Sequence, residues 1–213
     1  MSKRRFLRRH HLSRIIGRKI IIACEGIKTE HGYFQAIRSS LRIPTLQVVV
    51  VRPDGTDPLT VVRRAVVEKN NHRRDRSWNK NDEAWAVFDG DEHRENNPTN
   101  WNNAIQLARA NDIRLAVSNP CFELWYILHF QNCERCLARH DAQKLLRKYI
   151  SDYTKGAVLW PEPLQTLTTS AIDRAKHLDS KYKRDNLDPY YNPSSGVWEL
   201  VDALLAFRTK THR

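Results

Sequence analysis

The chain has 213 residues, of which 40% are hydrophobic and 28% are charged, and its formal net charge at pH 7 is +12. This length suits one domain with a small elaboration, and the composition is close to that of globular proteins, so a buried core is expected. No uninterrupted apolar stretch approaches the roughly 20 residues needed to cross a bilayer, which excludes membrane-embedded functions.

The positive charge is concentrated in a basic N-terminal arm at positions 1–18. Residues 1–19 contain eight of the 36 Lys and Arg residues and no acidic residue. Such a segment is either a solvated arm or a tether for a nucleic acid or a protein partner. The candidate nucleic-acid contacts in the arm are Arg4, Arg5, Arg8 and Arg9.

The same arm lacks the apolar segment of ~7–15 residues that a secretory signal requires. The four cysteines form no disulfide framework for a chain of this size. We therefore expect a cytoplasmic protein with reduced thiols.

From residue 18 onward, short β-branched runs alternate with longer segments of helical period. Strands that alternate with helices pair in parallel through right-handed crossovers, so the pattern predicts an α/β fold with a mainly parallel, four-stranded sheet flanked by helices. The expected elements are a strand at 20–24, a helix at 30–41, a strand at 46–52, a helix at 58–72, a polar loop at 73–82, a strand at 84–88, a helix at 99–110 opened by Thr99, and a strand at 114–117.

The pattern changes after Pro120. A nearly all-apolar helix, CFELWYILHF, is followed by helical segments around 140–152, 165–183 and 195–209, with Ser194 or Ser195 as the N-cap of the last. We expect an α/β catalytic core at 19–130 and a helical C-terminal part at 131–213 that packs on it. The apolar helix would fasten the two together, or partly form the interface of a homodimer.

Two of the predicted strands run directly into acidic residues. Glu25 follows the strand at 20–24, and Asp89 and Asp91 follow the strand at 84–88. Residues two apart on an extended chain point to the same side, so Asp89 and Asp91 can share an ion. In open parallel sheets the functional crevice lies outside the carboxyl ends of the strands, where the strand order reverses. If the two strands are neighbours, the three carboxylates converge there, and one or two Mg²⁺ or Mn²⁺ ions are expected.

Each acidic motif taken alone has an ordinary structural explanation. An Asp-Gly-Asp turn after a strand is common. Glu30 follows Thr29, a candidate N-cap, and complements the helix dipole, although its position also faces the crevice and allows it to bind a second ion. Gly26 favours the functional interpretation, because glycine permits a close approach or a positive φ beside Glu25.

Three further side chains belong near the crevice. Glu123 is the only acidic residue of the apolar helix and lies in its first turn, so it is a metal ligand, a support for one, or half of a structural ion pair. His93 can orient water or touch phosphate, or it is merely solvated. Lys28 can contact phosphate from the first loop.

The segments CEGIKTE and FDGDEH, at this strand and helix spacing, look like the Toprim fold. Together, CEGIKTEHGYF, VFDGDEH and SNPCFELWYILHF resemble the RloB family of phage-defence proteins over roughly residues 19–130, with a weaker likeness beyond. The resemblance implies a Toprim-like fold and a metal-dependent nuclease. In it Glu25, Asp89 and Asp91 would bind the metal and act in catalysis, and Glu30 would be a second-site ligand.

The same resemblance implies biological expectations. Two ions would activate water and stabilise the leaving oxygen of a phosphodiester. RNA such as tRNA is the favoured substrate, with DNA open, and the chain would be the effector of a bacterial anti-phage system with an ABC-type ATPase partner. The alternative is a non-catalytic Toprim-like subunit that binds a nucleic acid or a partner within an ATPase complex.

Other chemistries are less favoured. His129, Cys133, Cys136 and His140 have a spacing that would suit zinc only with a bend near Asn132, since four ligands on one straight helix span too far. A haloacid-dehalogenase-type phosphatase places its D-x-D at the start of the chain. A nucleotide-sugar glycosyltransferase has no use for the acid after the first strand.

Overall fold

A computed structural model describes residues 18–26, 28–41, 47–51, 55–154 and 164–206, with the backbone alone at 47–51, 91 and 92. The predicted arm contacts Arg4, Arg5, Arg8 and Arg9 lie outside the described residues. The elements in chain order are β1 (Lys19–Cys24), α1 (Thr29–Leu41), β2 (Gln47–Val51), α2 (Pro58–Arg74), β3 (Glu83–Asp89), α3 (Asp91–Asn96), α4 (Pro98–Ala110), β4 (Arg114–Asn119), α5 (Glu123–Phe130), α6 (Arg139–Leu146), α7 (Leu164–Arg184), β5 (Ser194–Ser195) and α8 (Val197–Leu205).

The strands form one sheet in the order β2-β1-β3-β4-β5. The first four are parallel to their neighbours, and β5 is antiparallel to β4. The predicted α/β fold with a mainly parallel, four-stranded sheet is thus confirmed, with one short edge strand added. Because β2 and β3 flank β1 on opposite sides, the strand order reverses between β1 and β3, and the crevice is expected at their carboxyl ends.

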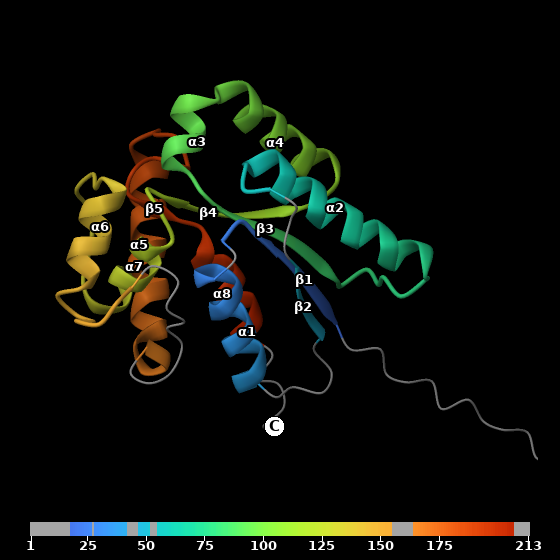
Figure 1. The fold of residues 1–213 in the computed structure, drawn as a ribbon, viewed down its shortest axis with the longest axis horizontal. Coiled ribbons are helices and arrows are strands. Elements are labelled where there is room, and N and C mark those ends of the chain that lie inside the picture. Colours follow the sequence, from blue (N-terminus) through green and yellow to red (C-terminus); the bar gives the residue numbers. More distant parts are fainter. Residues whose placement is uncertain (1–17, 27, 42–46, 52–54, 155–163, 207–213) are drawn as a thin grey trace, which may run out of the picture.

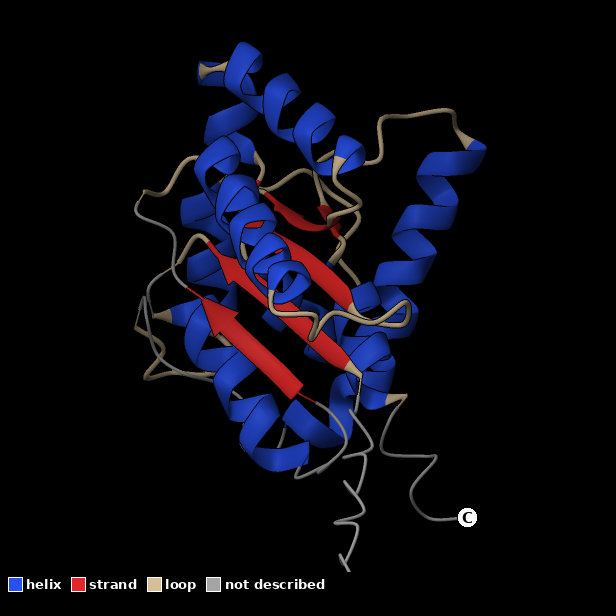
Figure 2. Cartoon of the chain, turned by 90° about the vertical axis from the view of Figure 1, so that its right-hand side faces the viewer, coloured by secondary structure: helices blue, strands red, loops and turns tan. Residues whose placement is uncertain are grey.

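Helices cover both faces of the sheet, which explains why its strands are apolar on both sides. α2 and α4 lie against one face, and α1, α5, α7 and α8 pack on the other (Figures 1 and 2). Ile21 and Ala23 of β1 belong to the first core, while Ile20, Ile22 and Cys24 belong to the second. Packing on both sides therefore fixes the position of Glu25, the residue that follows β1.

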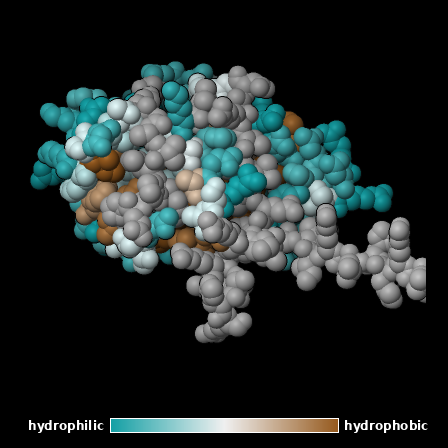
Figure 3. All heavy atoms as spheres, turned by 60° about the horizontal axis from the view of Figure 1, so that its bottom comes forward, coloured by the Kyte–Doolittle hydropathy of each residue, from teal (hydrophilic) through white to brown (hydrophobic). Residues whose placement is uncertain are grey.

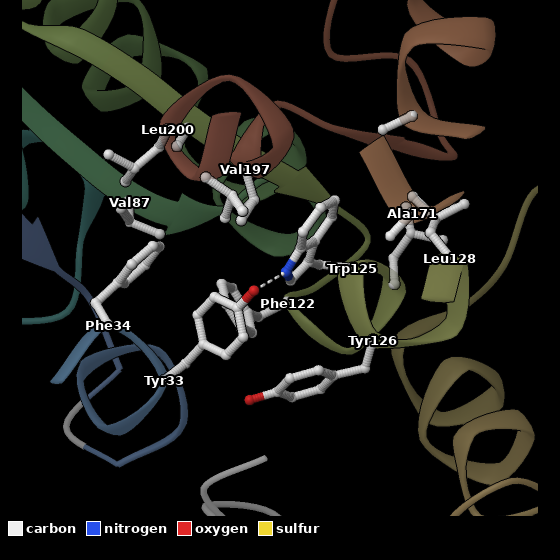
Figure 4. Close-up of a cluster of buried hydrophobic side chains, with 14 of the residues drawn as sticks. Tyr33, Phe34, Val87, Phe122, Trp125, Tyr126, Leu128, Ala171, Val197 and Leu200 are labelled. Atoms are coloured by element: carbon white, nitrogen blue, oxygen red, sulfur yellow. Dashed lines mark hydrogen bonds between the residues drawn. The ribbon is translucent and has the colours of Figure 1, made fainter. Parts of the chain in front are cut away.

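An aromatic cluster joins α1 to α5 in the second core (Figure 4). Tyr33 contacts Phe122 and Tyr126 edge to face, and its hydroxyl accepts a 2.7 Å hydrogen bond from the indole N–H of Trp125. α5 is buried from Glu123 to His129 within the single chain. The apolar helix therefore connects the sheet to α7, as its composition indicated, and the homodimer stays a prediction.

The described surface exposes few large hydrophobic side chains. Those that are exposed are Val67, Tyr149, Leu187 and Tyr191. Figure 3 shows one face, where hydrophilic residues and smaller hydrophobic groups are intermixed. None of the described helices is both long enough and apolar enough for a membrane span.

Several predicted boundaries were wrong for local reasons. α4 begins at Pro98, and the side chain of Asn97, not Thr99, accepts the capping hydrogen bond, from the Asn100 N–H. Thr29 is the first residue of α1 rather than its cap. α3, a single short helix, was not predicted.

The C-terminal part also differs from the prediction. Ser194 and Ser195 form β5 rather than a helix cap, and the hydroxyl of Ser195 lies 3.0 Å from that of Ser118 on β4. α8 begins at Val197, with Gly196 as its N-cap residue. A strand of two residues has no periodicity, so sequence alone could not reveal it.

Candidate metal centre

Glu25 joins the carboxyl ends of β1 and β3. Its backbone N–H donates to the carbonyl of Val87 at 2.9 Å, which extends the ladder by one residue. Its carboxylate accepts the backbone N–H of Asp89 at 3.0 Å, and Nε2 of His93 lies 3.0 Å from its other oxygen. The predicted accessory residue His93 therefore contacts an acidic side chain and orients it.

Asp89, the last residue of β3, is only 6% exposed, and both of its carboxylate oxygens have protein partners. Oδ1 accepts the backbone N–H of Phe122 at 2.9 Å, at the entrance to α5. Oδ2 pairs with Nη1 of Arg139 at 2.8 Å, at the start of α6. Asp89 thus connects the sheet to two helices of the C-terminal part.

Glu30 lies in the first turn of α1 and packs over Gly26. A Cβ placed on Gly26 would stand 1.5 Å from Oε2 of Glu30. The φ of Gly26 lies outside the left-handed region, so close approach, not backbone conformation, is the reason for glycine here. Of the two roles expected for Gly26, the structure supports the first.

Glu123 is 4% exposed at the start of α5. Its Oε1 accepts hydrogen bonds from the Tyr153 hydroxyl at 2.9 Å and from the Gln143 side-chain amide at 3.2 Å. These neutral donors hydrogen-bond to a buried carboxylate, and among the described residues Glu123 has no ion-pair partner, although an ion pair was one expectation. Glu123 is therefore held by hydrogen bonds from neutral side chains, and it lines the same cavity as Glu25, Glu30 and Asp89.

These acids surround a cavity of about 440 Å³ at the carboxyl ends of β1 and β3. This is the place where open α/β sheets bind their ligands. The exposed side chain of Lys28 lies at its edge. The lining residues are Glu25, Gly26, Lys28, Thr29, Glu30, Thr56, Asp89, Phe122, Glu123 and Arg139.

The electrostatics of the cavity oppose full ionisation of its acids. Burial, together with the charges of Glu25 and Glu123, raises the pKa of Glu30 to about 7. Burial raises the pKa of Asp89 well above its usual range, and the charges of Glu30 and Glu25 raise it further. The Arg139 guanidinium lowers both pKa values, although it does not reverse either shift. The cluster is therefore short of positive charge.

The donor set suits a hard divalent cation, because it consists of carboxylate oxygens. Even so, within the described residues no three His, Cys, Asp or Glu side chains are already arranged to hold a metal ion. In this arrangement the oxygens of Glu25 and Asp89 are engaged by protein donors. The residues fit Mg²⁺ or Mn²⁺ in chemistry, and their carboxylates must turn to bind it.

The structure corrects the predicted geometry at Asp91. Gly90 has helical φ and ψ angles, and Asp91 is the first residue of α3. The chain is therefore not extended between Asp89 and Asp91, and the argument that the two share a side fails. The side chain of Asp91 lies outside the described residues, so its role as a ligand stays a prediction.

The alternative zinc group does not assemble. His129 is buried in α5 with Nδ1 2.9 Å from the carbonyl of Trp125, while Cys136 is exposed and its thiol bonds to the carbonyl of Asn192. α5 ends at Phe130, so the four residues do not lie on one straight helix, which was the obstacle to a zinc site. Even so, the described part of the chain contains no metal-binding group at these positions.

Sequence reasoning missed Arg139, Gln143 and Tyr153. They lie 16 to 30 positions beyond Glu123 and 50 or more beyond Asp89, and they belong to no motif with either acid. The sequence contained one signal for Arg139. A cation at the first position of a helix is unfavourable beside the helix dipole, and a nearby acid offsets this cost.

The fold and the cavity define an α/β protein with a carboxylate site at the switch point of its sheet. Residues 20–204 match the family described as RloB-like protein. The chain therefore belongs to the RloB-like family, as the three sequence motifs indicated, and the match extends into α8. Neither the curated proteins nor the solved structures gave a match.

Proposed function

We propose that this protein is a metal-dependent nuclease that hydrolyses phosphodiester bonds in nucleic acid. The observation that carries the proposal is the convergence of Glu25, Glu30, Asp89 and Glu123 on one cavity at the switch point of the sheet. A buried group of like charges needs a compensating cation, and oxygen ligands favour Mg²⁺ or Mn²⁺. Such ions are the common catalysts of phosphodiester hydrolysis.

In this proposal Glu25 and Asp89 hold the catalytic ion, Asp91 assists them, and Glu30 serves a second ion. Glu123 is a further ligand or a support for one. When bound, the ions activate a water molecule and stabilise the leaving oxygen. These residues would form a Toprim-type endonuclease site. The assignment is supported by acids at the carboxyl ends of β1 and β3, which are neighbours in the sheet.

Two further residues, His93 and Lys28, would assist these ligands. His93 holds the Glu25 carboxylate from one side while the Asp89 N–H holds it from the other. Lys28, exposed at the edge of the cavity, supplies a positive charge that attracts the substrate phosphate.

The substrate and partners follow from the resemblance to RloB proteins and from the charge of the chain. RNA such as tRNA is the first candidate and DNA the second. The net charge of +12 suits either, because phosphate neutralisation dominates nucleic-acid affinity. A role as the cytoplasmic effector of an anti-phage system, acting with an ABC-type ATPase, belongs to the same proposal.

One observation favours a second candidate function. Both oxygens of Asp89 already have protein donors, as a purely structural carboxylate would. In that case the chain is a non-catalytic Toprim-like subunit that binds nucleic acid or the ATPase.

Cleavage separates the two. Purified full-length protein is incubated with tRNA and with duplex DNA in Mg²⁺, in Mn²⁺ and in EDTA, beside the Glu25→Gln and Asp89→Asn variants. The nuclease predicts cleavage that needs the metal and both acids. In parallel, the ends of nucleic acids are sequenced from cells that express wild type or Asp89→Asn. Discrete tRNA breaks or broad DNA nicks identify the substrate, and no metal-dependent cleavage in any assay rejects the nuclease.

A further inference from the structure

Arg139 lines the cavity and forms an ion pair with Asp89, but the proposed metal site assigns it no role. We infer that Arg139 is a substrate-binding residue: its guanidinium neutralises Asp89 in the metal-free protein, and it transfers to a phosphate of the nucleic acid when a divalent cation takes over Asp89. This inference rests on the proposed nuclease function. It assigns to Arg139 two successive anionic partners in one cavity.

The position of Arg139 supports the first partner. Nη1 lies 2.8 Å from Oδ2 of Asp89, and the Arg139 side chain is 22% exposed while that of Asp89 is 9% exposed. The guanidinium thus bridges the buried acid and the open part of the cavity that Glu25, Glu30 and Lys28 line. A modest rotation of a long side chain can move it from the acid toward a bound ligand.

The position of Arg139 in its helix is unfavourable for a cation. Arg139 is the first residue of α6, where the positive end of the helix dipole disfavours a cation. The N-cap residue, Ala138, contributes no side-chain cap that would offset this cost. One turn later, Gln143 reaches Glu123. α6 therefore presents to the cavity two side chains that each contact one of its acids.

The two oxygens of Asp89 differ in what holds them. Oδ1 accepts a backbone N–H, from Phe122, and that donor is fixed by the start of α5. Oδ2 is held by a flexible side chain, so it becomes available to a cation only when Arg139 leaves. The guanidinium stays charged after it leaves, and its planar set of N–H donors matches two oxygens of a phosphate.

The test uses a matched pair of variants on α6. Arg139→Gln and Lys144→Gln each remove one positive charge, but Lys144 is exposed and lies outside the cavity lining. Mn²⁺ binding to the full chain is measured by titration calorimetry without nucleic acid, and cleavage is measured as kcat and KM on the substrate found above. The Tm in EDTA reports whether each variant folds.

We expect opposite effects on the two readouts. Arg139→Gln should bind Mn²⁺ about tenfold more tightly, because a competing charge is gone. Its kcat should fall by about 100-fold, because a donor to the reacting phosphate is lost. Lys144→Gln should change both by less than about twofold, as an exposed charge does. Arg139→Lys keeps the charge without the planar fork and should show wild-type Mn²⁺ affinity with reduced kcat.

Other outcomes overturn the inference in recognisable ways. Weaker Mn²⁺ binding in a folded Arg139→Gln variant would make Arg139 a scaffold for Asp89 only. Tighter binding with unchanged kcat and KM would make it a counter-charge without a substrate contact. If Arg139→Gln does not fold, Arg139→Lys decides, and wild-type kcat there rejects the phosphate contact. A wild type that neither binds Mn²⁺ nor cleaves nucleic acid instead rejects the proposed function itself.

Discussion

The two ends of β3 are both acidic, yet they have different surroundings. Glu83 starts the strand and pairs with Arg18 and with Arg114, the latter at 3.4 Å, and it accepts the indole N–H of Trp85. Asp89 ends the strand among Glu25, Glu30 and Glu123, and in the described part of the chain Arg139 forms an ion pair with it. The amino end is balanced in charge, and the carboxyl end is not.

Cavity size does not distinguish these two ends. A larger hollow, of about 670 Å³, lies at the amino edge of the sheet, lined in part by Arg18, Glu83 and Arg114. The smaller hollow at the carboxyl edge holds the buried acids, whose charge Arg139 compensates only in part. What marks a candidate site here is therefore an excess of buried charge of one sign, which protons or a ligand of the opposite sign can relieve.

The largest expected effect is on cleavage activity, when the acid at each end of β3 is replaced in turn by its neutral amide. Asp89→Asn should lower metal-dependent cleavage by about a thousandfold or more, because a ligand of the catalytic ion is lost. The variant should fold, since an asparagine oxygen can still accept the Phe122 N–H. Glu83→Gln should cleave within about twofold of wild type and lose about 1 kcal/mol of stability or less, because its ion pairs are partly exposed. Equal activities of the two variants would show that the carboxyl end of β3 is no more important for cleavage than its amino end.

The next effect is a pH dependence confined to the carboxyl end. The pKa of Glu30 is raised to about 7 in the folded protein, so the folded state holds a proton that the unfolded state has already released. The contribution of Glu30 to stability in EDTA should therefore be fully present below about pH 4.5 and should be lost, by about 3 kcal/mol, as the pH rises to about 7. Denaturation curves of wild type and Glu30→Gln measure it.

Glu30→Gln should flatten this decline, because its amide does not titrate. Asp82→Asn is the matched change at the amino end, where the carboxylate accepts the backbone N–H groups of Lys19 and Asn79. In Asp82→Asn the stability should fall with rising pH as much as it does in the wild type. A wild type whose stability rises between these pH values would show that the acids of the cavity are compensated.

Much of the fold and part of the candidate site could be predicted from the sequence, and the missing part has a physical cause. β-branched runs and helical periods gave the sheet and its flanking helices, and parallel pairing brought Glu25 near Asp89. These are consequences of local pattern and topology. Glu25 and Asp89 could therefore be expected to converge if their strands were neighbours, and the pairing of β1 with β3 meets that condition.

The donors that engage the acids could not be predicted in this way. Arg139 reaches Asp89 across 50 positions, and Tyr153 reaches Glu123 across 30. Such contacts depend on how α6 and the turn after it pack on α5, which no periodicity encodes. The extended geometry expected at Asp91 also failed, because Gly90 starts a helix where an alternating strand pattern was assumed.

A smaller effect should follow from filling the space that Glu30 occupies. In Gly26→Ala the new Cβ would collide with the Glu30 carboxylate, whose flexible end must then move out of the cluster. Mn²⁺ affinity should fall by about tenfold, since one oxygen donor is displaced. Gly55→Ala is the control, because a Cβ there meets its nearest atom at 3.4 Å, an ordinary contact. An unchanged Mn²⁺ affinity in Gly26→Ala would show that Glu30 is no ligand.

The smallest expected effect tests whether Glu123 needs its neutral donors. Tyr153 is buried and its hydroxyl bonds to Glu123, so Tyr153→Phe should cost about 1 kcal/mol of stability by leaving part of a buried carboxylate unsatisfied. Tyr149→Phe removes a hydroxyl that bonds to Gln131 at the surface and should cost little. Urea denaturation measures both. If the two variants are equally stable, Glu123 does not depend on the Tyr153 hydroxyl for its hydrogen bonds. The acids at the carboxyl end of β3 then have more hydrogen-bond donors than the comparison with Glu83 indicates.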